Sequence, residues 1–282
     1  MFEQSELLTF WSAVVDPHGR GMAESIAADI ASYTRESIEV VLDKMNRGKD
    51  EFKQLWNASS IDTRSEASIA KFYDGQFVEA YELANWHSGQ ENGVPPLNYA
   101  RAAFVAKTEG LVRALDFGSG IGTGALCLSA VGCEVECADV ATDLLRFVDH
   151  RLSERAVHAR IIKLSVGERP RQHYYDLITC FDVLEHVPDQ LAKLMELQSY
   201  LRPGGYLLVN LLKDSSDPDR PMHVSSAGER LELVRATALQ PQWRYYDGDM
   251  QVLRWTRTGG VRNYFAAWVD RLQQRRTADQ VS

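Results

Sequence analysis

A glycine-rich run at residues 115–124, Leu-Asp-Phe-Gly-Ser-Gly-Ile-Gly-Thr-Gly, constrains the fold more than any other segment of the chain. An apolar stretch ends at Asp116, glycines occupy every second position from Gly118 to Gly124, and an apolar helical pattern begins at Ala125. Glycine readily adopts positive φ and lets a ligand approach the backbone closely. The following helix presents unpaired N–H groups and partial positive charge at its N-terminus, which suit an anionic group. The run therefore predicts a strand, a tight turn and a helix arranged around a ligand.

The spacing of these glycines distinguishes between two kinds of nucleotide-binding site that the turn could form. The dinucleotide fingerprint is G-x-G-x-x-G, whereas here the third glycine comes one residue early and Asp116 precedes the first glycine by two residues. A carboxylate at that place would repel a pyrophosphate and would suit the ammonium group of an amino-acid-like ligand. The pattern resembles motif I of the class I S-adenosylmethionine (SAM) methyltransferases, a hydrophobic strand followed by D/E-x-G-x-G-x-G. A dinucleotide fold and a purely structural glycine turn are the alternatives.

A second acid follows the next predicted strand. Apolar and polar residues alternate from Cys133 to Val140, which indicates a strand that ends on Asp139. In nucleoside-binding α/β folds, an acid at the tip of the second strand bonds the ribose hydroxyls. Asp139 is therefore the predicted ribose ligand, and an ordinary solvated acid is the alternative.

The segment Tyr175–Pro188 reads as a buried strand, a loop and the start of a helix. It resembles the "YDxxxxxxVLEHV" segment of the ubiquinone-pathway O-methyltransferases. That resemblance implies that the backbone at Phe181 and Asp182 lines the methionine end of SAM, with His186 near the pocket floor. A structural histidine that bonds the backbone is the alternative for His186.

The segment Leu201–Asn210 contains L-x-P-G-G and then an apolar strand, and it resembles the start of the fifth strand in the same family. The resemblance covers residues 97–257 and implies SAM as the cofactor. The cofactor-binding residues that it implies are Asp116, Phe117, Gly118, Ser119, Gly120, Gly122, Asp139, Val140, Leu164, Phe181, Asp182 and His186.

Strand and helix patterns alternate through residues 97–212, as in a doubly wound α/β domain. Strands are expected near 112–116, 133–138, 159–164, 175–181 and 205–211, with helices at 98–109, 122–131, 142–154 and 189–200. The resemblance implies a seven-stranded Rossmann-like sheet. A hairpin over 243–255 with an Asp-Gly turn agrees with its last two strands. Further helices are expected at 229–238 and 261–274, within a SAM-binding domain over 96–282.

Residues 1–95 show helical spacing at 7–15, 26–45, 52–56 and 65–86, followed by a linker rich in Gly and Pro. The resemblance implies an all-helical cap over the cofactor mouth, so we expect this region to contact the acceptor. Tyr73, Tyr81 and Trp86 are predicted to form one wall of an apolar acceptor pocket, with ordinary core packing as the alternative.

Three histidines are candidate catalytic residues. An alcohol or phenol acceptor needs a base with a pKa near the working pH, whereas a carboxylate acceptor does not. His223 is the first choice, because loops at the carboxyl ends of strands carry the chemistry of open α/β sheets. His186 and His87 are the other candidates, and a hydrogen-bonded, noncatalytic histidine is the alternative for each.

Composition excludes several other classes. The 282 residues carry a net charge of −8 and no basic block, which disfavours nucleic acid as a partner. No apolar run approaches the ~18 residues of a membrane span, and the N-terminus lacks a signal-peptide pattern, so a cytoplasmic monomer or homodimer is expected. The four cysteines form no C-x-x-C and no cluster with histidine, so no metal site is predicted.

These features predict a SAM-dependent methyltransferase that acts at oxygen on a small-molecule or natural-product-type acceptor. A methyltransferase acting on a peptide or protein, for example at a carboxylate, is one alternative. A noncatalytic SAM-binding protein is the other, because an intact cofactor site does not by itself establish catalysis.

Overall fold

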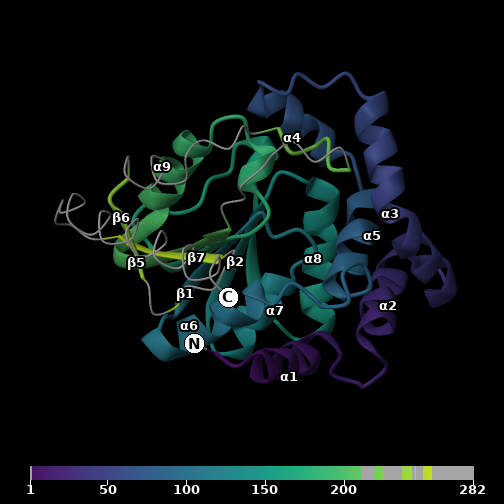
Figure 1. The fold of residues 1–282 in the computed structure, drawn as a ribbon, viewed down its shortest axis with the longest axis horizontal. Coiled ribbons are helices and arrows are strands. Elements are labelled where there is room, and N and C mark those ends of the chain that lie inside the picture. Colours follow the sequence, from purple (N-terminus) through teal and green to yellow (C-terminus); the bar gives the residue numbers. More distant parts are fainter. Residues whose placement is uncertain (1, 211–218, 225–236, 243–244, 246–249, 256–282) are drawn as a thin grey trace, which may run out of the picture.

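The computed structural model describes residues 2–210, 219–224, 237–242, 245 and 250–255, and it shows a seven-stranded sheet flanked by helices (Figure 1). The strands are β1 (Arg113–Phe117), β2 (Glu134–Asp139), β3 (Ala159–Lys163), β4 (Tyr175–Cys180), β5 (Leu201–Asn210), β6 (Leu239–Pro241) and β7 (Met250–Trp255). Their order is β3-β2-β1-β4-β5-β7-β6. Strands β1 to β5 run parallel, and β7 pairs antiparallel with both β5 and β6. This is the doubly wound seven-stranded α/β sheet that the sequence predicts.

Side chains of alternate strand residues enter two separate apolar cores, one on each face of the sheet. Ala114 and Leu177 belong to the core shared with α6 (Asn98–Glu109), α7 (Thr123–Ala130) and α8 (Thr142–Glu154). Leu115 and Ile178 belong to the core shared with α9 (Gln190–Tyr200). A strand buried on both faces is mostly apolar, and β4 fits this, since all six of its residues are buried and only Asp176 and Thr179 carry strongly polar side chains. The strand order reverses between β1 and β4, where open α/β sheets bind their ligands.

The helical N-terminal region contains α1 (Gln4–Val15), α2 (Met22–Thr34), α3 (Ile38–Ala58), α4 (Glu66–Asp74) and α5 (Val78–His87). Figure 1 shows α1, α2 and α3 running around one side of the sheet domain, with α4 beyond them. We call these five helices the cap. Buried cap residues such as Trp11 and Met45 join the same apolar core as Leu128 of α7. The core is thus continuous across residue 95, and the division into two domains there stays a prediction.

The expected single helix at 26–45 is wrong, because the chain breaks at Arg35 and starts again at Ser37. Arg35 has a φ of 61°, which ends α2, and the Ser37 hydroxyl accepts from Val40 N and caps α3. Helix α3 then runs through Gly48, where the sequence suggested an end. A Cβ at Gly48 would lie 2.6 Å from Glu82 N, so this glycine permits close packing of α3 on α5.

Two other predictions need correction. The expected helix at 65–86 is two helices, because α4 ends at Gly75 and α5 begins at Val78. The strand that precedes β7 in the terminal pair is β6, earlier in the chain than the hairpin predicted over 243–255. The Asp-Gly turn, the helix at 261–274 and most of the helix at 229–238 lie outside the described residues.

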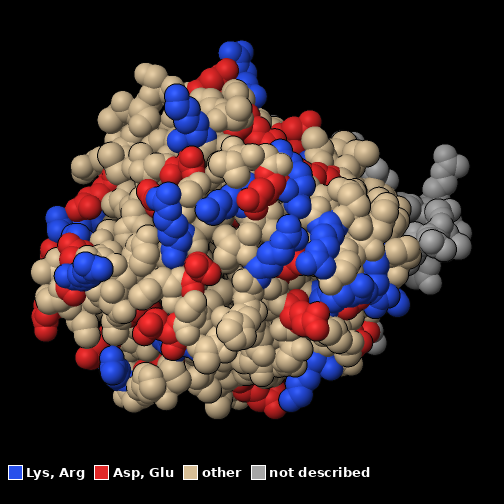
Figure 2. Space-filling model, turned by 180° about the vertical axis from the view of Figure 1, so that it is seen from behind, with Lys and Arg blue, Asp and Glu red and all other residues tan. Residues whose placement is uncertain are grey.

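The surface carries mixed charge. Figure 2 shows basic and acidic side chains interspersed on the described part of one face, in keeping with the net charge of −8. Within the described ranges, no helix combines the length and apolar character needed to cross a membrane.

Candidate active site

A cavity of about 830 Å³ lies between the carboxyl ends of the central strands and cap helices α4 and α5. Its volume falls within the range of small-molecule sites, roughly 300–1,000 Å³. Nine of the predicted cofactor residues line it, namely Phe117, Gly118, Gly120, Asp139, Val140, Leu164, Phe181, Asp182 and His186. The structure thus brings residues from four strand ends together at one place.

The glycine turn presents bare backbone to this cavity. Gly118 and Gly120 have φ values of 72° and 49°, in the region that disfavours side chains. A Cβ at Gly118 would lie 2.2 Å from a methyl of Val183, and one at Gly120 would lie 2.9 Å from a methyl of Leu83. Both the conformation and the close contacts therefore require glycine here.

Asp139 lies beside the turn at the end of β2. Its Oδ2 accepts from Gly120 N at 2.9 Å and its Oδ1 accepts from Ala141 N at 3.0 Å. Burial raises the pKa of this carboxyl, and the backbone N–H groups partly offset that effect. Each carboxylate oxygen has a second acceptor position, so Asp139 can still accept from ligand hydroxyls.

Asp116 does not line the cavity, although the sequence argument gave it a ligand ammonium group. It is 2 % exposed, and its Oδ1 accepts from the Thr179 hydroxyl at 2.8 Å. A Cβ at Gly124 would lie 2.4 Å from its Oδ2, so the carboxyl packs against the start of α7. Burial raises the pKa of Asp116 to about 7. The lining of the cavity also leaves out Ser119 and Gly122.

His87 is buried at the end of α5 and lines the cavity. Its Nδ1 lies 2.9 Å from the Thr123 hydroxyl, which also accepts from Arg151 at 3.1 Å. His87 Nε2 is buried and has no hydrogen-bond partner among the described residues. Burial and the charge of Arg151 lower the pKa of His87 to about 3. This low pKa keeps the buried His87 imidazole neutral at pH 7.

His186 lies at the other side of the cavity, in the short 3₁₀ helix η2 (Leu184–His186). Its Nδ1 lies 3.0 Å from the Tyr73 hydroxyl and 3.2 Å from the Met222 carbonyl. A carbonyl only accepts, so Nδ1 carries the proton and Nε2 keeps its lone pair. Burial and the neighbouring His223 lower the pKa of His186 to about 3.

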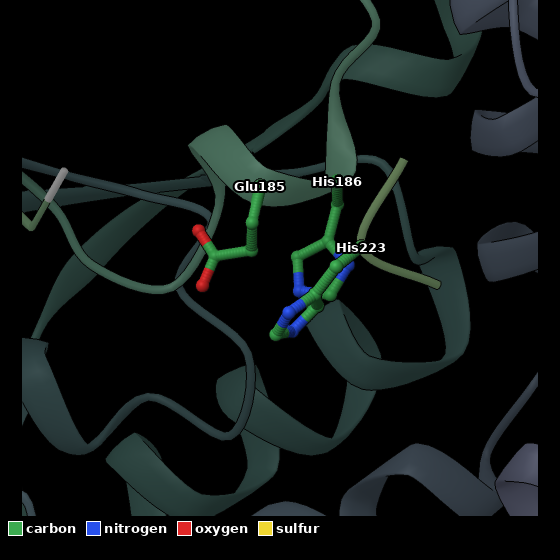
Figure 3. A group of neighbouring side chains, drawn as sticks. All are labelled: Glu185, His186 and His223. Carbon is green, nitrogen blue, oxygen red and sulfur yellow. The ribbon is translucent and has the colours of Figure 1, made fainter. Parts of the chain in front are cut away.

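His223 packs against His186, as Figure 3 shows, with ring centroids 5.0 Å apart. Ligand atoms of Glu185, His186 and His223 all lie within 4.8 Å of one another. Burial and the charge of Asp182 raise the pKa of Glu185 to about 8. The sequence analysis did not predict this cluster, because it depends on a long-range contact. A backbone hydrogen bond from Val224 N to Glu185 O holds the segment 219–224 against η2.

The three predicted aromatic wall residues separate in the structure. Tyr73 and Trp86 line the cavity, whereas Tyr81 does not. The Tyr81 hydroxyl donates to Glu36 at 3.3 Å and lies 3.4 Å from Lys44 Nζ, so it joins α5 to the start of α3.

The lining residues that the sequence argument missed include Glu79 on α5, Tyr99 on α6 and Lys193 on α9. The Tyr99 ring packs edge-on against Phe181 with centroids 5.2 Å apart. Lys193 is mostly buried and pairs with Glu66 of α4 at 2.7 Å, which joins the cap to α9. Their helical spacing is the only signal in the sequence, and that spacing does not show which face of a helix will line a cavity.

Comparison with known proteins fits this geometry. A family profile described as a methyltransferase domain matches residues 89–260, more than half of the chain. The chain belongs to the methyltransferase-domain family. This membership confirms the predicted class I methyltransferase resemblance, and with it SAM as the cofactor. The residues present fit SAM, since bare glycine backbone and the Asp139 carboxylate meet in a cavity of suitable size.

Two curated relatives of this chain are named as ubiquinone biosynthesis O-methyltransferases. The one from Xanthomonas campestris pv. campestris is 30 % identical over 156 residues, covering 52 % of this chain and 64 % of the relative. The one from Xanthomonas euvesicatoria pv. vesicatoria is 29 % identical over 161 residues, covering 54 % and 66 %. The chain thus spans less than two thirds of the length of these relatives.

Among solved structures, the StiE O-MT segment is 14 % identical, with a TM-score of 0.52 over 66 % of this chain and 83 % of that one. At this identity the similarity shows the fold alone.

Proposed function

We propose that this chain transfers the methyl group of SAM to an oxygen atom of a small-molecule acceptor. The observation that carries the proposal is the layout of the cavity. The glycine turn and Asp139 lie at the strand ends, and His186, within a cluster of titratable groups, lines the same space. The names of the curated relatives support oxygen as the methylated atom.

The sheet edge holds the cofactor in this proposal. Asp139 accepts from the ribose hydroxyls, the backbone at Gly118 and Gly120 meets the amino-acid end, and Val140 and Leu164 contact the base. The chemistry that SAM supplies when bound is an electrophilic methyl group on a positively charged sulfur. The protein's main contribution is to hold the acceptor oxygen in line with that methyl group, because orientation alone can supply up to roughly 7–11 kcal/mol.

His186 is the residue that we assign to the acceptor hydroxyl. It lines the cavity and its Nε2 lone pair is available, so it can accept a hydrogen bond from the acceptor hydroxyl and orient the oxygen. Because burial lowers its pKa to about 3, it takes the proton only as methyl transfer makes that hydroxyl strongly acidic. The Glu185 carboxyl lies close to His186, whereas the neighbouring His223 lowers the pKa of His186 and so disfavours its charged form. His223, the first choice from the sequence, acts beside His186 in this proposal.

Aromatic side chains favour an apolar or aromatic acceptor. Tyr73, Trp86 and Tyr99 line the cavity from three different helices. A hydroxylated aromatic ring would pack against these surfaces and present its oxygen to His186.

The test is release of S-adenosylhomocysteine (SAH) with a panel of phenols, using wild type and His186→Asn. The variant should lose about 10²–10⁴-fold in turnover, the usual contribution of a general base. Calorimetry should show unchanged affinity for SAM. An unchanged turnover would remove His186 from the mechanism, and SAM binding without turnover on any acceptor would favour the noncatalytic alternative.

The Glu185, His186 and His223 cluster favours a second means of activating the acceptor. Two imidazoles and a carboxylate suit a divalent ion, and such an ion lowers the pKa of a bound hydroxyl. If a chelator abolishes activity and added Zn²⁺ or Mn²⁺ restores it, the acceptor is activated by a bound metal ion. If the chelator has no effect, His186 acts on the acceptor hydroxyl directly.

A further inference from the structure

Glu79 of the cap is a partly buried acid that no step above uses. It lines the cavity from α5, whereas Asp139 lines it from the sheet. Its Oε2 is buried and has no hydrogen-bond partner among the described residues. Burying a carboxylate oxygen without a partner is costly, so such a group in a ligand cavity indicates that the ligand completes its contacts.

The charged groups that act on Glu79 within the described chain are acidic. They are Asp139 at the end of β2 and Glu82 on the same helix. Tyr73 on α4 is the neutral titratable neighbour, and Glu79 is the largest charge acting on it. Burial, Asp139 and Glu82 together raise the pKa of Glu79 well above its usual value. The missing partner is therefore a cation or a hydrogen-bond donor.

We propose that Glu79 is a cofactor ligand supplied by the cap, and that its carboxylate recognises the positively charged sulfonium and ribose portion of SAM from the side opposite Asp139. This inference rests on SAM as the cofactor. The observations behind it are the shared cavity wall, the unpartnered oxygen and the absence of any cation paired with Glu79 among the described residues.

Two consequences follow from the charge of the ligand. SAM carries a positive sulfur and the product SAH does not, and charges interact strongly where water is excluded. Glu79 should therefore favour SAM over SAH and help the product to leave. A nearby cation also stabilises the ionised carboxylate, so binding of SAM should release a proton that binding of SAH does not.

The experiment is calorimetry of the full chain with SAM and with SAH, each in two buffers of different ionisation enthalpy. Wild type should release more protons with SAM than with SAH. Glu79→Gln should lose that difference and bind SAM about tenfold more weakly, the usual effect of one hydrogen bond to a charged group. Its affinity for SAH should change less than about twofold.

Glu82→Gln is the matched control. Glu82 lies on the same helix, and burial raises its pKa to about 7, but it does not line the cavity and its nearest cation is Arg220 at 3.9 Å. This variant should keep the ratio of SAM to SAH affinity of wild type, and its excess proton release with SAM should fall only in part, because Glu82 contributes to the raised pKa of Glu79.

Thermal unfolding without ligand separates binding from folding. Glu79→Gln should melt at or above the wild-type temperature, because it removes a partly buried acid that lacks a partner. Equal weakening for SAM and SAH with a lower melting temperature would mean a structural role and overturn the inference. Wild-type behaviour of Glu79→Gln would also overturn it while leaving the proposed function intact. Failure of wild type to bind either compound would instead overturn the cofactor assignment.

Discussion

The sheet edge and the cap contribute to the same cavity in different ways. At the sheet edge, Gly118, Gly120 and Asp139 are fixed by backbone hydrogen bonds and positive φ angles within a short stretch of chain. In the cap, Tyr73 and Glu79 reach the cavity only because two separate helices pack over it. We therefore expect the sheet-edge part of the proposed cofactor site to depend on local geometry, and the contributions of the cap to cofactor and acceptor to depend on long-range packing.

Gly120→Val tests whether the glycine turn at the sheet edge is needed to bind SAM. The new side chain would collide with Leu83, occupy the cavity and adopt an unfavourable φ of 49°. Affinity for SAM should fall by roughly a hundredfold or more, since overpacking and positive φ each cost about 1–3 kcal/mol. The measurement is calorimetry. Gly19→Val is the control, because Gly19 has a φ of 66° with open space around its Cβ position and does not line the cavity.

Asp139→Asn tests the carboxylate at the same edge. The variant loses the charge that accepts from the ligand and from Gly120 N, so affinity for SAM should fall about 10- to 100-fold. Asp16→Asn is the control, since Asp16 also accepts from two backbone N–H groups, of Arg20 and Gly21, far from the cavity. Equal affinity of Asp139→Asn and wild type would exclude Asp139 as a ribose ligand.

Tyr73→Phe tests the cap. It removes the hydroxyl 3.0 Å from His186 Nδ1, so turnover should fall about fivefold to tenfold, the value of about 1 kcal/mol for one hydrogen bond. Affinity for SAM should not change. Tyr81→Phe is matched in chemistry but lies outside the cavity, and its turnover should equal that of wild type. Equal losses in the two variants would show that the cap acts through stability alone.

His87→Asn should change how the free energy of unfolding depends on pH. The folded-state pKa of about 3 lies below the unfolded value of about 6.5. Below pH 6.5 the unfolded chain therefore binds the extra proton, and wild type loses about 1.4 kcal/mol of stability per pH unit from this group. Urea unfolding at pH 7, 6 and 5 should show a shallower loss in the variant. An exposed histidine variant, His18→Asn, should retain the wild-type slope, and an unchanged slope in His87→Asn would contradict its burial as a neutral group.

The sequence predicted the sheet domain well, because its signals are local. Alternating or continuous apolar runs set the strands, and the glycine spacing set the turn at Gly118 to Gly122. The position of Asp139 beside the turn could be predicted because an acid at the end of the second strand has a fixed relation to that turn, and its role toward ribose stays a prediction. The position of Asp116 against α7 could not be predicted, because the sequence does not say whether an acid before the first glycine points to the ligand or to the next helix.

The cap was less predictable for a physical reason. Tyr81 was chosen for its aromatic ring, yet Glu79, two residues earlier and on another side of α5, faces the cavity. The predicted helix stopped before Gly48, because glycine usually weakens a helix. Here glycine is required for a close contact with Glu82, which comes from a distant part of the chain and cannot be seen in the local sequence. The pairing of His186 with His223 likewise depends on tertiary contacts that no local pattern encodes.

A crystal structure of the full chain with SAH and a phenolic acceptor tests the central claim most directly. The account predicts the ribose within hydrogen-bond distance of Asp139, the amino-acid end against Gly118 and Gly120, and the acceptor oxygen beside His186 Nε2. A ligand bound elsewhere, or a cavity that stays empty at saturating SAH, would contradict it.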